Sequence, residues 1–167
     1  FVEQNQLTKT KAVIGFLLGI SNKDIRLQTT GKELQTHIHI ALFHFLQLIT
    51  LRCNLSSIPM VFVLEDLHWM DGLSMQALCF LIQKFNELDI KPGYSSLFVF
   101  DYRQTFELPE DIKSGNNFNE LELPPLSNDH AQEMIRAAIH LDVLPKYELK
   151  NIMKISGGNP FYIEEWI

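Results

Sequence analysis

One segment, residues 61–71, constrains the fold of this chain more than any other. It reads Val-Phe-Val-Leu-Glu-Asp-Leu-His-Trp-Met-Asp. The four apolar residues predict a short buried strand, and Glu65 and Asp66 follow it directly. Burying carboxylates at a strand end is costly unless a metal ion or hydrogen-bond donors meet them. Open α/β sheets bind ligands at the carboxyl ends of their strands. The pattern therefore predicts an edge where the acids hold Mg²⁺ and orient a water beside a nucleotide's terminal phosphate.

A simpler interpretation of the same acids stays open. An acidic residue after a strand often does no more than cap the next helix. A helix is expected over residues 74–88, and Asp71 or Ser74 is placed to cap it. We expect Asp71 to be such a cap rather than a metal ligand, and Trp69 to pack against neighbouring residues.

Composition narrows the class of protein. The 167 residues favour a single domain, and 46% apolar with 20% charged residues is ordinary for a globular core. The net charge is −6 and the basic residues are scattered, so no nucleic-acid-binding face is expected. Cys53 and Cys79 form neither a metal-ligand spacing nor a disulfide framework, which favours a reducing, cytoplasmic setting. No continuous apolar run approaches the length of a membrane span. Because the chain begins at Phe1 rather than Met, we expect an excerpt of a longer protein.

Hydrophobic periodicity and turn residues predict the order of the elements. Short, nearly continuous apolar strands that alternate with helices favour a parallel sheet covered on both faces. The stretch 104–117 is expected to be a loop. Expected helices cover residues 4–19, 32–52, 74–88, 127–140, 145–156 and the segment from Pro160, and expected strands cover 60–65, 96–101 and 120–123.

The order of the first two strands predicts where their ends lie. A right-handed crossover through the helix at 74–88 would bring the strand at 97–100 back parallel to the strand at 61–64. Equivalent ends of parallel neighbours meet at the same edge of a sheet. We therefore expect Arg103 to lie at the edge that carries Glu65 and Asp66.

Four motifs together resemble a known family. Residues 65–71 resemble its "DDLHWAD" signature, and Arg103 follows a strand as in its "hhhxxxR" element. Residues 123–127, Leu-Pro-Pro-Leu-Ser, resemble its "LxPLs" boundary, and residues 157–165 resemble its "GGNPFfieE" element. In this order the motifs resemble the STAND class of P-loop NTPases, signal-transduction ATPases with an AAA-type ATPase module. The form of these motifs is most similar to that in the ATPase modules fused to class III adenylyl and guanylyl cyclases, including the soluble adenylyl cyclases.

The resemblance implies a fold and a function. The fold is a three-layer α/β parallel sheet of the P-loop NTPase type, with residues 1–126 as a partial core and 127–167 as the start of a helical lid. The function is a regulatory ATP-binding and ATPase module that controls an effector domain in the same chain, whether cyclase, kinase or DNA-binding, with homo-oligomer formation possible. ATP and Mg²⁺ are the implied ligands.

The resemblance also assigns roles to individual residues. Glu65 and Asp66 would hold Mg²⁺, and Asp66 would orient or activate the attacking water. Arg103 would reach the terminal phosphate, although a surface ion pair with Asp101 or Glu107 is the open alternative. Asn159 and Pro160 match the element whose proline contacts the adenine, although Gly and Pro at this point also mark a simple helix boundary.

The chain departs from the family pattern in ways that keep a rival function open. The order of Glu65 and Asp66 reverses the commoner pair, and Asp101 stands where a small or polar residue is usual. The phosphate-cradling sequence GxxxxGK[ST] is absent, since the Gly31-Lys32 pair lacks its flanking residues. We expect that loop upstream of Phe1. The rival is a non-catalytic interaction scaffold with the same fold.

Overall fold

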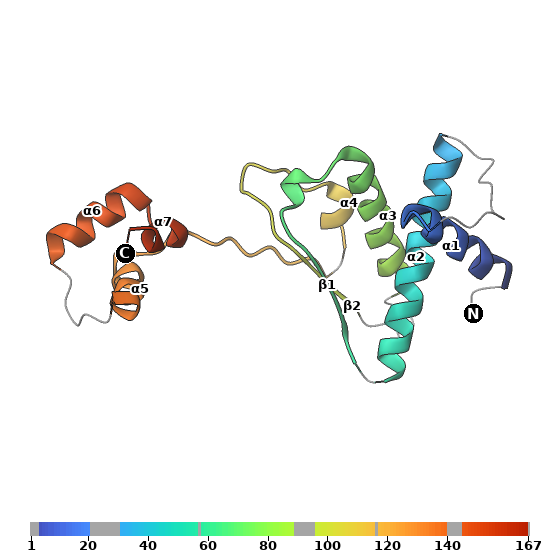
Figure 1. The fold of residues 1–167 in the computed structure, drawn as a ribbon, viewed down its shortest axis with the longest axis horizontal. Coiled ribbons are helices and arrows are strands. Elements are labelled where there is room, and N and C mark those ends of the chain that lie inside the picture. The colour runs from blue at the N-terminus through green and yellow to red at the C-terminus, as the bar shows by residue number, and fades with distance from the viewer. Residues whose placement is uncertain are drawn as a thin grey trace. The chain divides into compact units, whose positions relative to one another are not determined.

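The chain folds into two compact units, Phe1–Phe118 and Asn119–Ile167, each with its own hydrophobic core. The computed structural model describes residues 4–20, 31–56, 58–88, 96–115, 117–139 and 145–166 (Figure 1). The boundary expected between residues 126 and 127 followed a sequence motif, whereas contacts along the chain divide it earlier, after Phe118.

The first unit is mixed α/β and mostly helical. Its helices and strands lie close to the expected ranges, and the short helix α4 occupies part of the stretch 104–117 that was expected to be a loop. The elements of this unit are α1 Gln4–Leu17, α2 Lys32–Leu55, β1 Met60–Leu64, the 3-10 helix η1 Leu67–Trp69, α3 Gly72–Leu88, β2 Ser96–Phe100 and α4 Glu110–Lys113.

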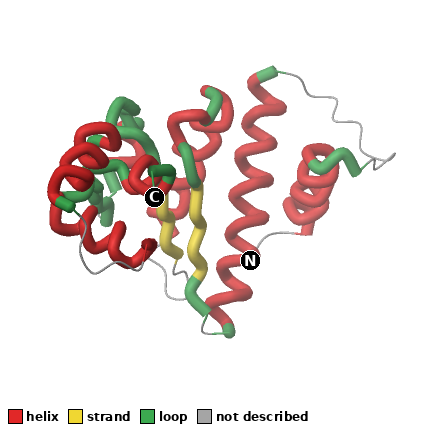
Figure 2. Tube along the Cα trace, turned by 60° about the vertical axis from the view of Figure 1, so that its left-hand side comes forward, coloured by secondary structure: helices red, strands yellow, loops and turns green. Residues whose placement is uncertain are grey.

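Strands β1 and β2 are parallel neighbours, as predicted, and they pair in register from Met60 opposite Ser96 to Leu64 opposite Phe100. Figure 2 shows the two strands side by side with helices next to them. On one face, the rings of Phe62 and Phe98 stack with centroids 4.7 Å apart. Phe85 of α3 meets both rings edge-on, at 5.7 and 5.2 Å. This aromatic cluster fixes α3 on that face of the sheet.

The other face of the sheet is open to solvent. Its side chains are apolar, and they are 42–61% exposed: Val61, Val63, Leu97 and Val99. Cover on both faces was expected from the apolar strands. In the described residues only one face is covered, and the sheet has two strands, so a three-layer architecture is not present within them.

Helix α2 has the length and apolar composition of a helix that can cross a membrane. The sequence pattern did not reveal this, because polar residues interrupt every continuous apolar run. The helix contacts α1, α3 and β1, and only 11% of its apolar window is buried. The expectation that the chain contains no membrane span stays a prediction.

The second unit contains three helices around a small core. Helices α5 Asn128–Ile139, α6 Lys146–Ser156 and α7 Pro160–Glu164 bury Ala131, Ile135 and Ile163 against one another. The predicted strand at residues 120–123 is wrong. Its Glu-Leu-Glu-Leu alternation has a strand's period, but Leu121 and Leu123 are both exposed, and no strand of the described residues pairs with this segment.

The Gly-Gly motif of the second unit has a packing role. Gly157 ends α6 in the left-handed conformation, as the sequence predicted. Gly158, at φ 80°, accepts a hydrogen bond from the Leu126 N–H through its carbonyl oxygen at 2.8 Å. A Cβ at Gly158 would lie 2.7 Å from the Leu126 carbonyl oxygen, whereas a Cβ at Gly157 would meet nothing within 4 Å. Two of the four family-like motifs, at 123–127 and 157–165, are therefore in direct contact.

We expect Gly158→Ala to destabilise the chain more than Gly157→Ala. Both substitutions place alanine at positive φ, which costs roughly 1–2 kcal/mol. Only Gly158→Ala also drives a methyl group into backbone, which costs about a further 1–3 kcal/mol. Urea denaturation followed by circular dichroism measures both free energies of unfolding. Equal losses for the two variants would contradict the packing role of Gly158.

Candidate functional site at the carboxyl ends of the strands

Glu65 and Asp66 follow β1 at the sheet edge where β2 also ends. Both side chains are exposed, and 68% of the Asp66 side chain is accessible. The premise that these acids are buried was therefore wrong, because the chain turns outward directly after Leu64. Solvent exposure removes any need for a metal ion to compensate burial, but it leaves both carboxylates free to meet a ligand.

Asp66 adopts a backbone conformation that most residues avoid. Its φ is 55° and its ψ is 44°, which is the left-handed region. No other non-glycine residue in the described part of the chain has a positive φ. Such a conformation costs roughly 1–2 kcal/mol, although aspartate and asparagine tolerate it better than most residues. Residues held in this way are common at functional sites, where the surrounding structure imposes the conformation.

The surrounding structure that imposes it comes from β2. The Asp66 N–H donates to Asp101 Oδ1 at 2.6 Å. The Asp101 N–H donates to the Leu64 carbonyl at 3.2 Å, and the Asp101 carbonyl accepts from the Leu67 N–H at 3.0 Å. Leu67 itself is fully buried in the core. Asp101, which departs from the family pattern, thus anchors the turn that presents Asp66.

His68 lies beneath this turn. Its side chain is 11% exposed, and neither ring nitrogen has a hydrogen-bond partner among the described residues. The nearest carboxylate oxygen is Asp66 Oδ1, 3.8 Å from Nε2, which is too long for a hydrogen bond. The His68 imidazole therefore packs beside the Asp66 carboxylate without a hydrogen bond to it.

Arg103 and Trp69 meet at the same edge. The Arg103 guanidinium lies over the Trp69 ring, with Cζ 5.9 Å from the ring centroid, which is cation–π geometry. No ion pair joins Arg103 to Asp101 or Glu107 in the described part of the chain, so the open alternative for Arg103 is wrong. Trp69 packs against neighbouring residues, as expected, since its ring contacts His68 and Arg103, but 74% of the residue is exposed.

Asp71 caps helix α3, as predicted. Its Oδ1 accepts from the N–H groups of Leu73, at 2.9 Å, and Ser74, at 3.1 Å, and its Oδ2 accepts from the Ser74 hydroxyl at 2.6 Å. These hydrogen bonds, those from Ser74 foremost, lower the pKa of the Asp71 carboxyl. Both oxygens of Asp71 are engaged in the cap, whereas the exposed side chains of Glu65 and Asp66 remain available to a cation.

The donor set fits one kind of metal binding. The described residues contain no group of three or more histidine, cysteine or acidic side chains that could cage a metal ion. Mg²⁺ in nucleotide sites needs no cage, since it keeps several waters and takes one or two carboxylates plus phosphate oxygens. Glu65 and Asp66 fit this requirement.

Asn159 and Pro160 lie in the second unit, and their local role is clear. Asn159 is the N-cap of α7, where its Oδ1 accepts from the Phe161 N–H at 3.0 Å, and Pro160 occupies the first turn. The helix-boundary interpretation of the Asn-Pro pair is thus confirmed. Both residues are exposed, so a further contact with a ligand stays a prediction.

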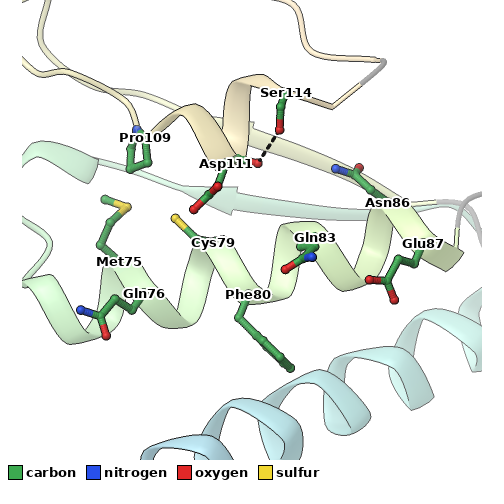
Figure 3. Close-up of a pocket in the computed structure, with 10 residues that line it drawn as sticks. All are labelled: Met75, Gln76, Cys79, Phe80, Gln83, Asn86, Glu87, Pro109, Asp111 and Ser114. Atoms are coloured by element: carbon green, nitrogen blue, oxygen red, sulfur yellow. Dashed lines mark hydrogen bonds between the residues drawn. The ribbon is translucent and has the colours of Figure 1, made fainter.

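A separate groove in the first unit lies between α3 and α4 (Figure 3). Cys79 faces it together with Met75, Pro109 and Asp111. Burial, and then the negative charge of Asp111, raise the pKa of the Cys79 thiol. A raised pKa disfavours the reactive thiolate, so Cys79 behaves as a packing residue.

In comparisons of the chain with protein-family models, curated proteins and solved structures, nothing matched. The function of the chain is therefore inferred from its own residues and from the motif resemblance.

The cap at Asp71 predicts a pH-dependent stability. A carboxyl whose pKa is lowered by folding stabilises the folded state above its ordinary pKa, near 4, and this contribution is lost as pH falls through the lowered value. We expect Asp71→Ala to lower the thermal midpoint clearly at pH 7 and progressively less below about pH 4. Asp71→Asn keeps a capping oxygen without the charge, so its deficit should be smaller at pH 7. A deficit for Asp71→Ala that stays constant from pH 7 to pH 2 would contradict this assignment.

Proposed function

We propose that this chain is part of a STAND-class P-loop NTPase, a regulatory module that binds and slowly hydrolyses ATP. The observation that carries the proposal is the shared edge. Two parallel strands in register end together, with Glu65 and Asp66 after one and Arg103 after the other. Two acids and an arginine that face one edge are the groups that a magnesium-bound triphosphate requires.

The roles follow from the chemistry of each group. Glu65 and Asp66 would hold Mg²⁺, which would neutralise charge on the phosphate oxygens when bound. Asp66, on its left-handed turn, would accept a proton from the attacking water. Arg103 would donate to the terminal phosphate as a fixed positive group. Asn159 and Pro160 of the second unit would contact the adenine, in addition to starting α7.

The open face of the sheet supports a larger core than the described residues form. Parallel sheets are almost always covered on both faces, and here four apolar side chains lie exposed on one of them. We propose that further strands and helices complete a three-layer sheet. The proposal also requires a phosphate-cradling loop from outside these 167 residues, because GxxxxGK[ST] does not occur in them.

The proposed setting is a cytoplasmic signalling protein. The ATPase module would control an effector domain in the same chain, such as a cyclase, kinase or DNA-binding domain, and the assembly could be a homo-oligomer. No nucleic acid would bind this segment directly, in keeping with its net charge of −6.

The 167-residue chain alone should not bind ATP tightly. Most phosphate affinity in such sites comes from backbone N–H groups and a lysine of the missing loop. Isothermal titration calorimetry with Mg-ATP should therefore give no dissociation constant in the micromolar range. Micromolar affinity would show that the phosphate site lies within these residues and that the proposed division is wrong.

In the full-length protein, Asp66→Asn should reduce ATP turnover by about 10²-fold or more, which is far more than it reduces ATP binding. Asparagine keeps the size of the side chain and tolerates the left-handed backbone, so the turn is preserved while the proton acceptor is lost. Phosphate release and nucleotide binding are measured on the same preparation, with Asp71→Asn as a matched control one turn away. If Asp66→Asn leaves turnover unchanged, or the wild type has none, the non-catalytic scaffold is the better description.

A further inference from the structure

Charges at the shared edge present a problem that the proposed function must solve. Three carboxylates, of Glu65, Asp66 and Asp101, lie on the residues that directly follow β1 and β2. Arg103 projects from the same edge. A long, exposed arginine next to several carboxylates ordinarily pairs with them, because bidentate arginine–carboxylate contacts are strong and geometrically favourable. Such pairing would occupy the acids that Mg²⁺ needs and the arginine that the phosphate needs.

The structure shows Arg103 elsewhere. Its guanidinium lies over the Trp69 ring at 5.9 Å, and it makes no ion pair with any described carboxylate. Trp69 is 74% exposed, and apart from Arg103 its ring contacts the ring of His68, with centroids 5.3 Å apart. An exposed tryptophan at the rim of an acidic edge thus serves as a platform for one cation.

Trp69 and Arg103 each belong to a turn that backbone hydrogen bonds hold in place. The Trp69 N–H donates to the Asp66 carbonyl at 2.9 Å, inside the 3-10 turn that Leu67 anchors in the core. Arg103 begins a tight turn, in which its carbonyl accepts from the Phe106 N–H at 2.8 Å. Because β1 and β2 pair in register, the two turns are held at one edge. The ring and the guanidinium therefore meet without ordering any flexible segment.

We propose that Trp69 is a positioning residue for Arg103. It holds the guanidinium on its ring and away from the carboxylates, so that Glu65 and Asp66 remain open to Mg²⁺ and Arg103 remains available to a terminal phosphate. The inference depends on the proposed function, since it concerns the regulation of that same site. Trp69 itself touches neither metal nor phosphate.

The contact itself is tested without nucleotide. The chain contains two tryptophans, so Trp166→Phe leaves Trp69 as the sole indole. In that background, Arg103→Ala should change the Trp69 emission and raise its quenching by acrylamide, a neutral probe, because one face of the ring is uncovered. Glu107→Ala, a charge change four residues away, is the control and should change neither. Identical quenching in the Arg103→Ala and parent proteins would overturn the proposal.

The consequence is tested through magnesium. In the full-length protein, Trp69→Ala should raise the Mg²⁺ concentration for half-maximal ATP binding by about two- to fivefold, which is the change in population that corresponds to the free energy of an exposed cation–π contact. Trp69→Phe keeps a ring and should give a smaller rise. In an Arg103→Ala background, Trp69→Ala should have no effect on the Mg²⁺ requirement, because the competing cation is absent.

The outcomes separate this inference from the function on which it depends. A rise with Trp69→Ala that persists undiminished in the Arg103→Ala background would show that Trp69 acts through packing and would overturn the positioning role. No rise in either background would overturn it as well. If Asp66→Asn leaves ATP turnover unchanged, the proposed function is wrong, and the positioning role that depends on it is wrong as well.

Discussion

The parallel, in-register pairing of β1 with β2 is the constraint on which the rest of this site depends. It brings two turns, separated by more than thirty residues of sequence, to one edge. The hydrogen bonds of Asp101 then join the end of β2 to the turn after β1, at Leu64, Asp66 and Leu67. Burial of Leu67 ties the same turn to the core. Any change that shifts the register by one residue would reverse the faces of a strand and separate Asp101 from Asp66.

The elements that the sequence predicted best are those with strong local signals. The strands at β1 and β2 are continuous apolar runs, and Asp71, the cap of α3, stands where a short polar side chain precedes apolar periodicity. Residues 120–123 had an equally regular alternation but formed no strand. A strand needs a partner, and periodicity reports only which faces a strand would have.

The site was predictable in its composition but not in its geometry. The acids were identified from their position after a strand and Arg103 from the motif resemblance, and the shared edge followed from topology. Their exposure did not follow, because the direction of the chain after Leu64 is set by the left-handed turn at Asp66. The roles of Asp101 and Trp69 depend on contacts between residues thirty or more positions apart, and only the predicted parallel pairing gave a hint of them.

The motif evidence has to be weighed against packing. Gly158 contacts the chain at Leu126, and Asn159 caps α7, so two of the four family-like motifs have structural reasons to exist without any ligand. The edge beyond β1 differs from them. Packing requires neither two adjacent exposed carboxylates nor an arginine held on an exposed tryptophan, and an αL aspartate costs stability that a glycine would not. Features that folding does not need are the stronger evidence for chemistry, and here they are concentrated at one edge of the sheet.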